Sequence, residues 1–228
     1  MHVQDNYLAL IRSIGETARR CGRDPSEIAL IVATKRHSLE EAMPAYLAGC
    51  RDFGESRIQE FLQKKVGAPQ NLRWHFIGTL QSNKLKAAMG CFALIHAVHN
   101  ADLLTQIAQY SSKLGIITSV LLQVNTSGEP TKHGLSPDQW RAQLSQIVQT
   151  PELTCGLCIK GLMTMAPLTE DATSIRQCFS RLRSFRDELA PLMGADFVHL
   201  SMGMSHDYQI AIEEGSTMLR LGTAVFQQ

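Results

Sequence analysis

A lysine directly after a hydrophobic run is the first residue whose position suggests chemistry. Lys35 follows the uninterrupted apolar run Ile28–Ala33, separated from it only by Thr34. Partial removal from water disfavours the charged form of a lysine, and a neutral amine can attack an aldehyde to form a Schiff base. A lysine that extends from a strand end into solvent is the simpler interpretation. Lys35 is therefore a candidate nucleophile whose role depends on its neighbours.

Two loops near the end of the chain suggest a phosphate site. Ser201–Ser205 and Gly222–Thr223 combine hydroxyls with glycines and can expose backbone N–H groups. The first also leads into a helix expected to begin at Asp207, and such a start suits a phosphate dianion. Arg220 lies in an apolar strand, where a buried charge needs an anionic or ring-nitrogen partner. Helix capping by the serines and a salt bridge for Arg220 are the alternatives.

The hydrophobic pattern predicts the elements that position these residues. Short apolar runs alternate with amphipathic stretches of helical spacing. The expected strands are Ile28–Ala33, Asp52–Gly54, Trp74–Ile77, Ala93–His96, Ser119–Val124, Thr154–Leu162, Phe197–Leu200 and Met218–Leu221. The expected helices are Val3–Arg20, Leu39–Ala48, Arg57–Lys65, Asn83–Met89, Ala101–Lys113, Pro137–Val148, Glu170–Leu189 and Asp207–Glu214, several of them capped, by Ser38, Ser82, Asn100, Ser136 and His206-Asp207.

Eight strand–helix alternations indicate an α/β fold with a parallel sheet covered by helices. A closed (β/α)8 barrel of the TIM type is the simplest architecture, and an open doubly wound sheet is the alternative. In a barrel the carboxyl ends of the strands form one mouth, which brings Lys35 and the two late loops together. We expect one domain over residues 1–228, no helix after the last strand, and the extra N-terminal helix Val3–Arg20 in that vacant position.

Composition narrows the functional classes. The 228 residues are 44% hydrophobic and 19% charged with a formal net charge of +1, which argues against a nucleic-acid binder that relies on bulk charge. There is no apolar run of about 20 residues to span a bilayer and no secretory signal. Six scattered cysteines favour a reduced, cytoplasmic protein. Cys155 and Cys158, three apart in an expected strand, should point to opposite faces and hold no metal.

Other motifs in the chain are weaker. His96 and His99 could form a zinc pair, but no carboxylate cluster accompanies them, so we interpret them as structural and expect no metal. His75 lies in an expected strand and should sit in the core or just behind a site. The segment from Gly203 to Asp207 lacks the Gly-x-Ser-x-Gly elbow of a hydrolase, and no dinucleotide fingerprint follows the first strand. Methionines such as Met204 could line a cofactor pocket or simply fill the core.

The motifs along the whole chain resemble one known family. The chain is similar to the pyridoxal phosphate homeostasis protein family, also called the YggS/PROSC family, within the alanine racemase N-terminal barrel superfamily. The matching segments are Ile31–Lys35, Phe53–Glu55, Gln59-Glu60, Trp74–Gly78, Leu80–Lys84, Gly161–Met163, Leu200–Ser205 with Asp207, and Gly215–Phe226.

The resemblance implies a cofactor and a role for each site residue. It implies the barrel of alanine racemase without that enzyme's second domain, with pyridoxal 5'-phosphate (PLP) held as a Schiff base on Lys35. It further implies that Ser201, Gly222 and Thr223 hold the phosphate and that Arg220 faces the pyridine nitrogen. An arginine there keeps the nitrogen unprotonated, because two cations repel, and this weakens the ring as an electron sink.

Some positions depart from the family pattern. Ser56 stands where the family usually has an asparagine, and this shorter side chain either loses a cofactor contact or makes it through water. Arg36 and His37 replace the Thr-Lys pair that often follows the Schiff-base lysine. Lys132 matches a position where the family commonly carries a lysine, for which we consider a role in cofactor delivery.

Two functions remain in view. The first is a non-catalytic carrier that binds PLP in the cytoplasm, buffers its free level and passes it to PLP-dependent apo-enzymes through transient contacts, as a monomer and with no nucleic acid or membrane partner. The second is a PLP-dependent amino-acid racemase, which needs acid–base groups on both faces of the ring. A phosphate-binding barrel enzyme with no pyridoxal is a third possibility, which predicts a colourless protein.

Overall fold

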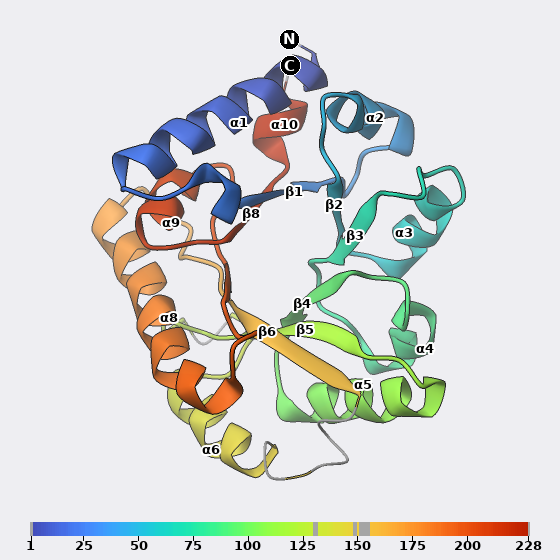
Figure 1. Ribbon diagram of the computed structural model, residues 1–228, viewed down its shortest axis with the longest axis vertical. Coiled ribbons are helices and arrows are strands. Elements are labelled where there is room, and N and C mark those ends of the chain that lie inside the picture. Colours follow the sequence, from blue (N-terminus) through green and yellow to red (C-terminus); the bar gives the residue numbers. More distant parts are fainter. Residues whose placement is uncertain (1, 130–131, 148–149, 151–155, 228) are drawn as a thin grey trace.

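The computed structural model describes residues 2–129, 132–147, 150 and 156–227 of the chain. Eight parallel strands form a closed barrel in sequence order, with β1 paired to β8, so the barrel is confirmed and the open sheet is excluded. Figure 1 shows the helices arranged as a ring around this barrel. The strands are β1 Ala29–Ala33, β2 Asp52–Glu55, β3 Arg73–Phe76, β4 Leu94–Val98, β5 Thr118–Gln123, β6 Leu157–Met163, β7 His199–Ser201 and β8 Met218–Leu221.

The helices follow the expected order, with differences at their ends. The α-helices are α1 Val3–Arg20, α2 Leu39–Leu47, α3 Ile58–Lys65, α4 Leu85–Ala88, α5 Ala101–Leu114, α6 Pro137–Ile147, α8 Ala172–Met193, α9 Tyr208–Glu213 and α10 Thr223–Phe226, and the 3-10 helices are η1 Pro25–Glu27 and η2 Ser82–Lys84. The single helix expected over residues 83–89 is thus a 3-10 turn followed by one short α-helical turn.

The N-terminal helix closes the ring of helices as expected. α1 packs against α2, α9 and α10, and Figure 1 shows it beside α10, with both chain ends at the top of the view. Asn6 is buried in α1 and its side-chain amide donates hydrogen bonds to the carbonyl oxygens of Val225 (3.0 Å) and Gln227 (2.8 Å). These bonds join the first helix of the chain to its last described residues.

The expectation that no helix follows the last strand was wrong. The short helix α10 begins directly after β8, with the carbonyl oxygen of Gly222 accepting from the amides of Val225 and Phe226. Its four residues are too few to show helical periodicity in a sequence. Packing against α1 and burial of Val225, rather than intrinsic propensity, stabilise so short a helix.

Three of the expected helix caps are present. Ser38 forms a reciprocal capping box at α2, the Asn100 side chain accepts from a first-turn amide of α5, and the Ser136 hydroxyl does the same at α6. Ser82 is different, because it lies inside η2 and not before it. Side chains that accept hydrogen bonds from a helix start are thus well predicted where the helix is long.

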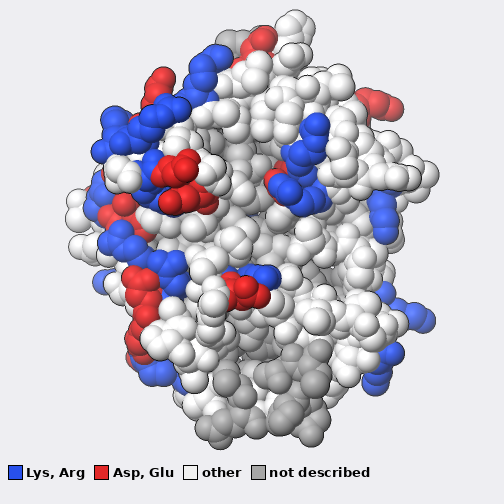
Figure 2. Space-filling model, in the orientation of Figure 1, with Lys and Arg blue, Asp and Glu red and all other residues white. Residues whose placement is uncertain are grey.

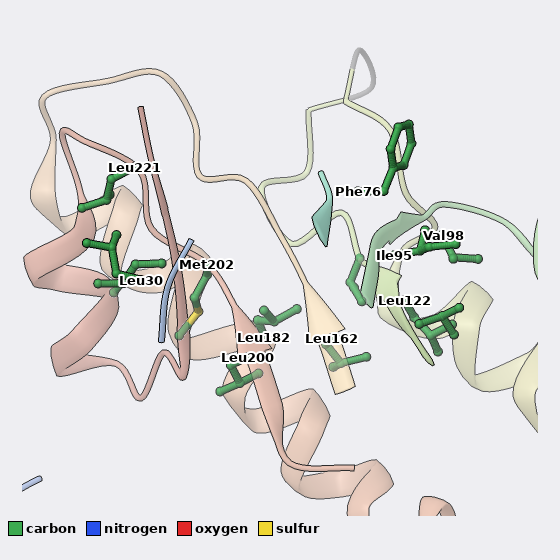
Figure 3. Packing of buried hydrophobic residues seen from close by; sticks show 14 of the residues in the cluster. Leu30, Phe76, Ile95, Val98, Leu122, Leu162, Leu182, Leu200, Met202 and Leu221 are labelled. Carbon is green, nitrogen blue, oxygen red and sulfur yellow. The ribbon is translucent and has the colours of Figure 1, made fainter. Parts of the chain in front are cut away.

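The core has two layers that follow from strand alternation. Outward-facing residues of the strands pack against the helices in one large cluster, and Figure 3 shows strand residues such as Leu30, Leu122 and Leu200 with Leu182 of α8. A second, smaller cluster fills the interior of the barrel. Its buried members are Ile31, Leu94, Ala97, Leu121, Met163 and Met218. Because side chains alternate across a strand, Met218 and Arg220 share the inner face of β8.

Charged side chains of both signs share the surface (Figure 2), and the described cysteines are not paired. Figure 2 shows acidic and basic side chains gathered at the left edge, where Figure 1 places α1 and α8, with fewer charges at the centre of that face. Within the described residues, no helix is long and apolar enough to cross a membrane. Cys158 has a free thiol, and so do the other described cysteines. Cys155, and with it the expected geometry of the pair, lies outside the described residues.

Candidate functional site

Three of the expected site residues line one cavity at the carboxyl ends of β1 and β8. Lys35, Gly222 and Thr223 border a cavity of about 290 Å³. The other lining residues are Ala33, Arg36, His37, Phe226 and Gln227. β1 and β8 are paired in parallel with Val32 opposite Leu221, so the residues that follow the two strands emerge at the same edge. Closure of the barrel thus joins two segments almost two hundred residues apart in sequence.

Lys35 is exposed, which fits the simpler interpretation of a lysine that extends from a strand end into solvent, and the partial burial that would favour its neutral form is not seen. The reason is that β1 ends at Ala33 and Thr34 is the last fully buried residue, so Lys35 already belongs to the rim of the mouth. Arg36 follows it in the left-handed region with φ of 67°. Such a backbone is uncommon for a residue other than glycine. It turns the chain sharply after Lys35.

Hydrogen bonds of its amide, hydroxyl and carbonyl groups fix Thr34, the residue before Lys35. The Thr34 amide donates to the Gly54 carbonyl (2.9 Å), and its hydroxyl donates to the buried carboxylate of Glu55 (2.5 Å). The Lys64 ammonium donates to the Thr34 carbonyl (2.8 Å) and forms an ion pair with Glu55. Glu55 is fully buried. Lys35 therefore extends from a fixed point of the backbone, although its own side chain reaches solvent.

Gly222 allows the two strands to approach at the cavity. A β-carbon at this position would lie 3.1 Å from the carbonyl oxygen of Ala33, closer than an ordinary contact. Thr223, the next residue, is exposed and is the first residue of α10. Gly222 and Thr223 thus line the same cavity as Lys35.

Arg220 lies just inside the barrel, below this cavity in the strand. It is only 6% exposed. Its guanidinium donates one hydrogen bond to the Ser201 hydroxyl (2.5 Å) and one to the carbonyl of Thr164 (3.0 Å). Burial lowers the pKa of Arg220 to about 10, and the nearby Asp207 carboxyl opposes this effect. Arg220 therefore remains a cation at neutral pH inside the mouth of the barrel.

Ser201 contacts Arg220 rather than the cavity. It is fully buried at the end of β7, and its hydroxyl bonds with Nδ1 of His96 (2.8 Å) as well as with Arg220. A direct contact between the Ser201 side chain and a phosphate therefore stays a prediction. In the structure, the side chain supports Arg220 from within the barrel.

The loop after β7 is organised by Asp207 and Ser205. We expected Asp207 to cap α9, but its carboxylate accepts from the Met204 amide (2.5 Å), the residue is 2% exposed, and burial raises its pKa. The Ser205 hydroxyl accepts from the Ala224 amide (3.1 Å) and so joins this loop to α10. Met204 itself is half-buried. Ser205, from the loop expected to face a phosphate, and Asp207, expected to cap the helix, thus both hold the loop together.

The remaining candidates lie away from the cavity of Lys35. Ser56 lines a separate cavity of about 270 Å³ after β2, together with residues of the loop after β3. Lys132 is half-buried and pairs with Glu129 (3.1 Å), and it donates to the Met165 carbonyl (3.4 Å). No group of three metal-binding side chains occurs in the described ranges, which leave out residues 1, 130–131, 148–149, 151–155 and 228.

Buried polar residues behind the cavity contribute to the site. The sequence placed His75 in the core or just behind a site and indicated a structural role for His96, whereas the roles of Asp52 and Glu55 were not predicted. His96 and His75 are buried and bonded to each other (3.0 Å), and His75 bonds with Asp52 (2.9 Å). Glu55 fixes Thr34, as described above. Their signal in the sequence is the occurrence of an ionisable residue in a strand that is otherwise apolar, because a buried charge must have a partner.

Comparisons with known proteins identify the family of the chain. The sequence profile of the family described as "Alanine racemase, N-terminal domain" matches residues 8–228. A pyridoxal phosphate homeostasis protein of Aquifex aeolicus is 37% identical over 227 residues, which cover 99% of this chain and 98% of the relative. The PipY protein of Synechococcus elongatus, solved with PLP bound, is 33% identical, with a TM-score of 0.83 and coverage of 99% and 100%.

A more distant structure confirms the fold. Alanine racemase of Bartonella henselae is 17% identical, with a TM-score of 0.73, and covers 99% of this chain and 61% of the racemase. At this identity the likeness concerns the barrel alone. With the full-length matches above, it follows that the chain belongs to the pyridoxal phosphate homeostasis protein family, which is built on the alanine racemase N-terminal barrel.

Proposed function

We propose that residues 1–228 form one barrel domain that binds PLP in the cavity between β1 and β8, with the aldehyde joined to Lys35. The observation that supports this most is the cavity that unites Lys35 with Gly222 and Thr223. When bound, the cofactor would supply an aldehyde with which the Lys35 amine would condense reversibly, with release of one water.

The residues around the cavity fit this cofactor. Thr223 offers a hydroxyl, and Gly222 keeps its backbone free of a side chain that would fill the space, so both suit the phosphate. Arg220, charged and buried, is the partner for the ring nitrogen, while Ser201 holds its guanidinium. Met204 and Ser56 lie on neighbouring loops and make peripheral contacts. When bound, the cofactor supplies a protected aldehyde.

We further propose that the protein is a carrier and not a catalyst. Exposed Lys35 and Thr223 leave one side of the cavity open, which suits a protein that loads and releases its ligand. A cation opposite the ring nitrogen keeps that nitrogen unprotonated and weakens the electron sink that racemisation needs. The relative from Aquifex aeolicus carries the name of a homeostasis protein and not of an enzyme.

Transfer to an apo-enzyme tests the carrier function. Loaded protein, freed of excess PLP, is mixed with an apo-enzyme, and its return of activity is followed against an equal amount of free PLP. We expect full reactivation, and we expect it to persist when a phosphatase is added that destroys free PLP. Reactivation that the phosphatase abolishes would contradict protected delivery. The variant Lys132→Ala tests a role for Lys132 in delivery. Its control is Lys113→Ala, which changes an exposed lysine of α5.

A racemase assay tests the alternative. The loaded protein is incubated with a panel of L-amino acids and the solution is analysed for D-products. The carrier function predicts no sustained turnover. Turnover that Lys35→Ala abolishes would establish the racemase instead.

The proposal includes a setting and an assembly state. We place the protein in the cytoplasm, where its free thiols stay reduced and where apo-enzymes need PLP. We expect a monomer that contacts these enzymes transiently. Light scattering during gel filtration of the loaded protein measures the mass, and a stable dimer would contradict the monomer.

A further inference from the structure

A line of hydrogen bonds crosses the interior of the barrel beneath the cavity. It starts at Arg220 on β8 and passes through Ser201 on β7 (2.5 Å) to His96 on β4 (2.8 Å). It continues from His96 to His75 on β3 (3.0 Å). We call these residues, together with Asp52 on β2, the interior chain.

The interior chain ends in an ion pair at the opposite end of the barrel. His75 bonds with Asp52 (2.9 Å), which begins β2, and Asp52 also accepts two hydrogen bonds from the Arg73 guanidinium (2.7 and 2.5 Å). The Arg73 side chain is largely exposed. The line therefore runs from the cofactor end of the barrel to its amino-terminal surface.

The end groups and the single proton of each ring together set the direction of the bonds. The carboxylate of Asp52 only accepts, so Nε2 of His75 carries a proton, and a guanidinium only donates, so the Ser201 oxygen accepts from Arg220. That oxygen has a second lone pair, so the direction of the Ser201 hydroxyl is set by His96 and not by Arg220. With one proton on each ring, His96 donates from Nε2 to Nδ1 of His75 and accepts from the Ser201 hydroxyl at Nδ1.

Burial and charge support a neutral His96 and an ionised Asp52. His96 is fully buried, and burial, together with the nearby Arg220 guanidinium, lowers its pKa well below the usual range, so it is neutral. Burial of Asp52 opposes ionisation, but hydrogen bonds from Arg73 and His75 outweigh it and lower the pKa of Asp52 to about 2. A neutral His96 between a cation and an anion is consistent with this direction of the bonds.

We propose that Asp52, His75 and His96 are positioning residues that act through Ser201 to hold Arg220 in one orientation toward the bound ring nitrogen. The effect on bound PLP rests on the proposed function, whereas the direction of the hydrogen bonds depends on the structure of the protein alone. Bonds that all point the same way polarise one another, and the charged Asp52 anchors the far end. Replacing one member therefore loosens Arg220 at a distance.

The first test uses the protein without cofactor. Long-range proton–nitrogen NMR on histidine-labelled protein, with signals assigned by single substitutions, reports which ring nitrogen carries the proton. We expect both His75 and His96 to be neutral with the proton on Nε2 at pH 7. A proton on Nδ1 of either ring, or a charged His96, would overturn the proposed direction regardless of PLP binding.

The second test measures the effect on bound PLP. Protein is loaded with PLP labelled with nitrogen-15 in the ring, and the dissociation constant and the ring-nitrogen signal are recorded. His96→Leu breaks the chain, and we expect about tenfold weaker binding with a shifted or broadened signal. His96→Gln can accept from Ser201 and donate to His75, so it should restore both. The matched control is His99→Leu, because His99 follows β4 directly and lies outside the interior chain. This variant should leave the dissociation constant and the ring-nitrogen signal unchanged.

The outcomes separate this inference from the proposed function. If the wild-type protein does not bind PLP, the proposed function fails, while the protonation states still test the chain. If the wild-type protein binds PLP and His96→Leu changes neither affinity nor signal, the positioning role fails alone. Should His96→Leu not fold, Asp52→Asn at the far end replaces it, with a smaller shift of the same signal expected and an unchanged signal contradicting the role.

Discussion

The rim of the cavity and the interior beneath it differ in burial and in freedom. On the rim, Lys35 and Thr223 are exposed and line an open cavity. In the interior, Arg220 and Ser201 are buried and every polar group that the interior chain uses has a partner. The two regions are only two residues apart on β8, because Arg220 lies within the strand and Gly222 directly after it.

This difference assigns binding and orientation to different regions. A lysine that must capture and release an aldehyde needs access to solvent, whereas a cation that must face one ring atom needs a fixed geometry. The Glu55–Lys64 pair joins the two regions, since it anchors Thr34 directly before Lys35. We therefore expect substitutions to lower the free energy of unfolding most at the interior supports and least at the exposed rim.

The largest effect should come from the ion pair that anchors Thr34. Lys64→Met leaves the fully buried Glu55 carboxylate without its cation, and we expect a loss of about 3–5 kcal/mol in the free energy of unfolding. Denaturant titration of the apo-protein measures it.

A double substitution controls for the lost packing. Adding Glu55→Leu to Lys64→Met removes the stranded charge as well, and we expect most of the stability to return. If the double variant is no more stable than Lys64→Met, burial of an unpaired charge is not the cause.

The next largest loss of stability should come from a substitution at Gly203, in the loop that follows β7. A β-carbon on Gly203 would lie 2.7 Å from Cβ of Ala211, and the residue has φ of 101°. We expect Gly203→Ala to cost about 2–4 kcal/mol, from overpacking and from an unfavourable backbone together. Gly115→Ala is the matched control, because Gly115 has φ of 64° with open space around it, and should cost only about 1 kcal/mol. Equal losses would show that contact plays no part.

A smaller effect should appear in acid. The pKa of Asp52 is lowered to about 2, so its contribution is fully present above its unfolded pKa near 4 and is lost as the pH falls toward 2. Allowing for partial solvent screening, we expect a loss of about 1–2 kcal/mol over this interval. Stability measured from pH 5 to pH 2 should fall less steeply in Asp52→Asn than in the wild type. Identical slopes would show that the ionised Asp52 carboxylate does not stabilise the folded protein, which would contradict its place in the interior chain.

The smallest effect should come from the rim. Lys35→Ala changes an exposed side chain, and we expect the free energy of unfolding of the apo-protein to change by less than about 0.5 kcal/mol. The same variant should lose covalent capture of PLP. A large loss of stability would mean that Lys35 supports the fold and that rim and interior are not separate.

The sequence predicted the fold well because the fold depends on local pattern. Eight apolar runs with helices between them left few topologies, and the observed barrel uses all eight. The short α10 was missed because four residues carry no periodicity, and its stability comes from α1, which is distant in sequence. A strand pairing such as β1 with β8 could be expected only once closure was assumed.

The candidate site was predicted in part. Lys35, Gly222 and Thr223 meet on one cavity, as the position of strand ends in a barrel implies. The orientation of Ser201 toward Arg220 and His96 could not be predicted, because it depends on which inward side chains of β4, β7 and β8 meet at one level. The stagger of the strands decides which side chains meet across a closed barrel, and short sequence motifs do not reveal this stagger.

The most direct test of the account is the identity of the lysine that PLP modifies. Protein loaded with one equivalent of PLP is reduced with borohydride, digested, and mapped by mass spectrometry. The account predicts the pyridoxyl group on Lys35 alone, with Lys35→Ala unmodified under the same conditions. Modification centred on Lys64, Lys132 or another lysine, with Lys35 left unchanged, would contradict it.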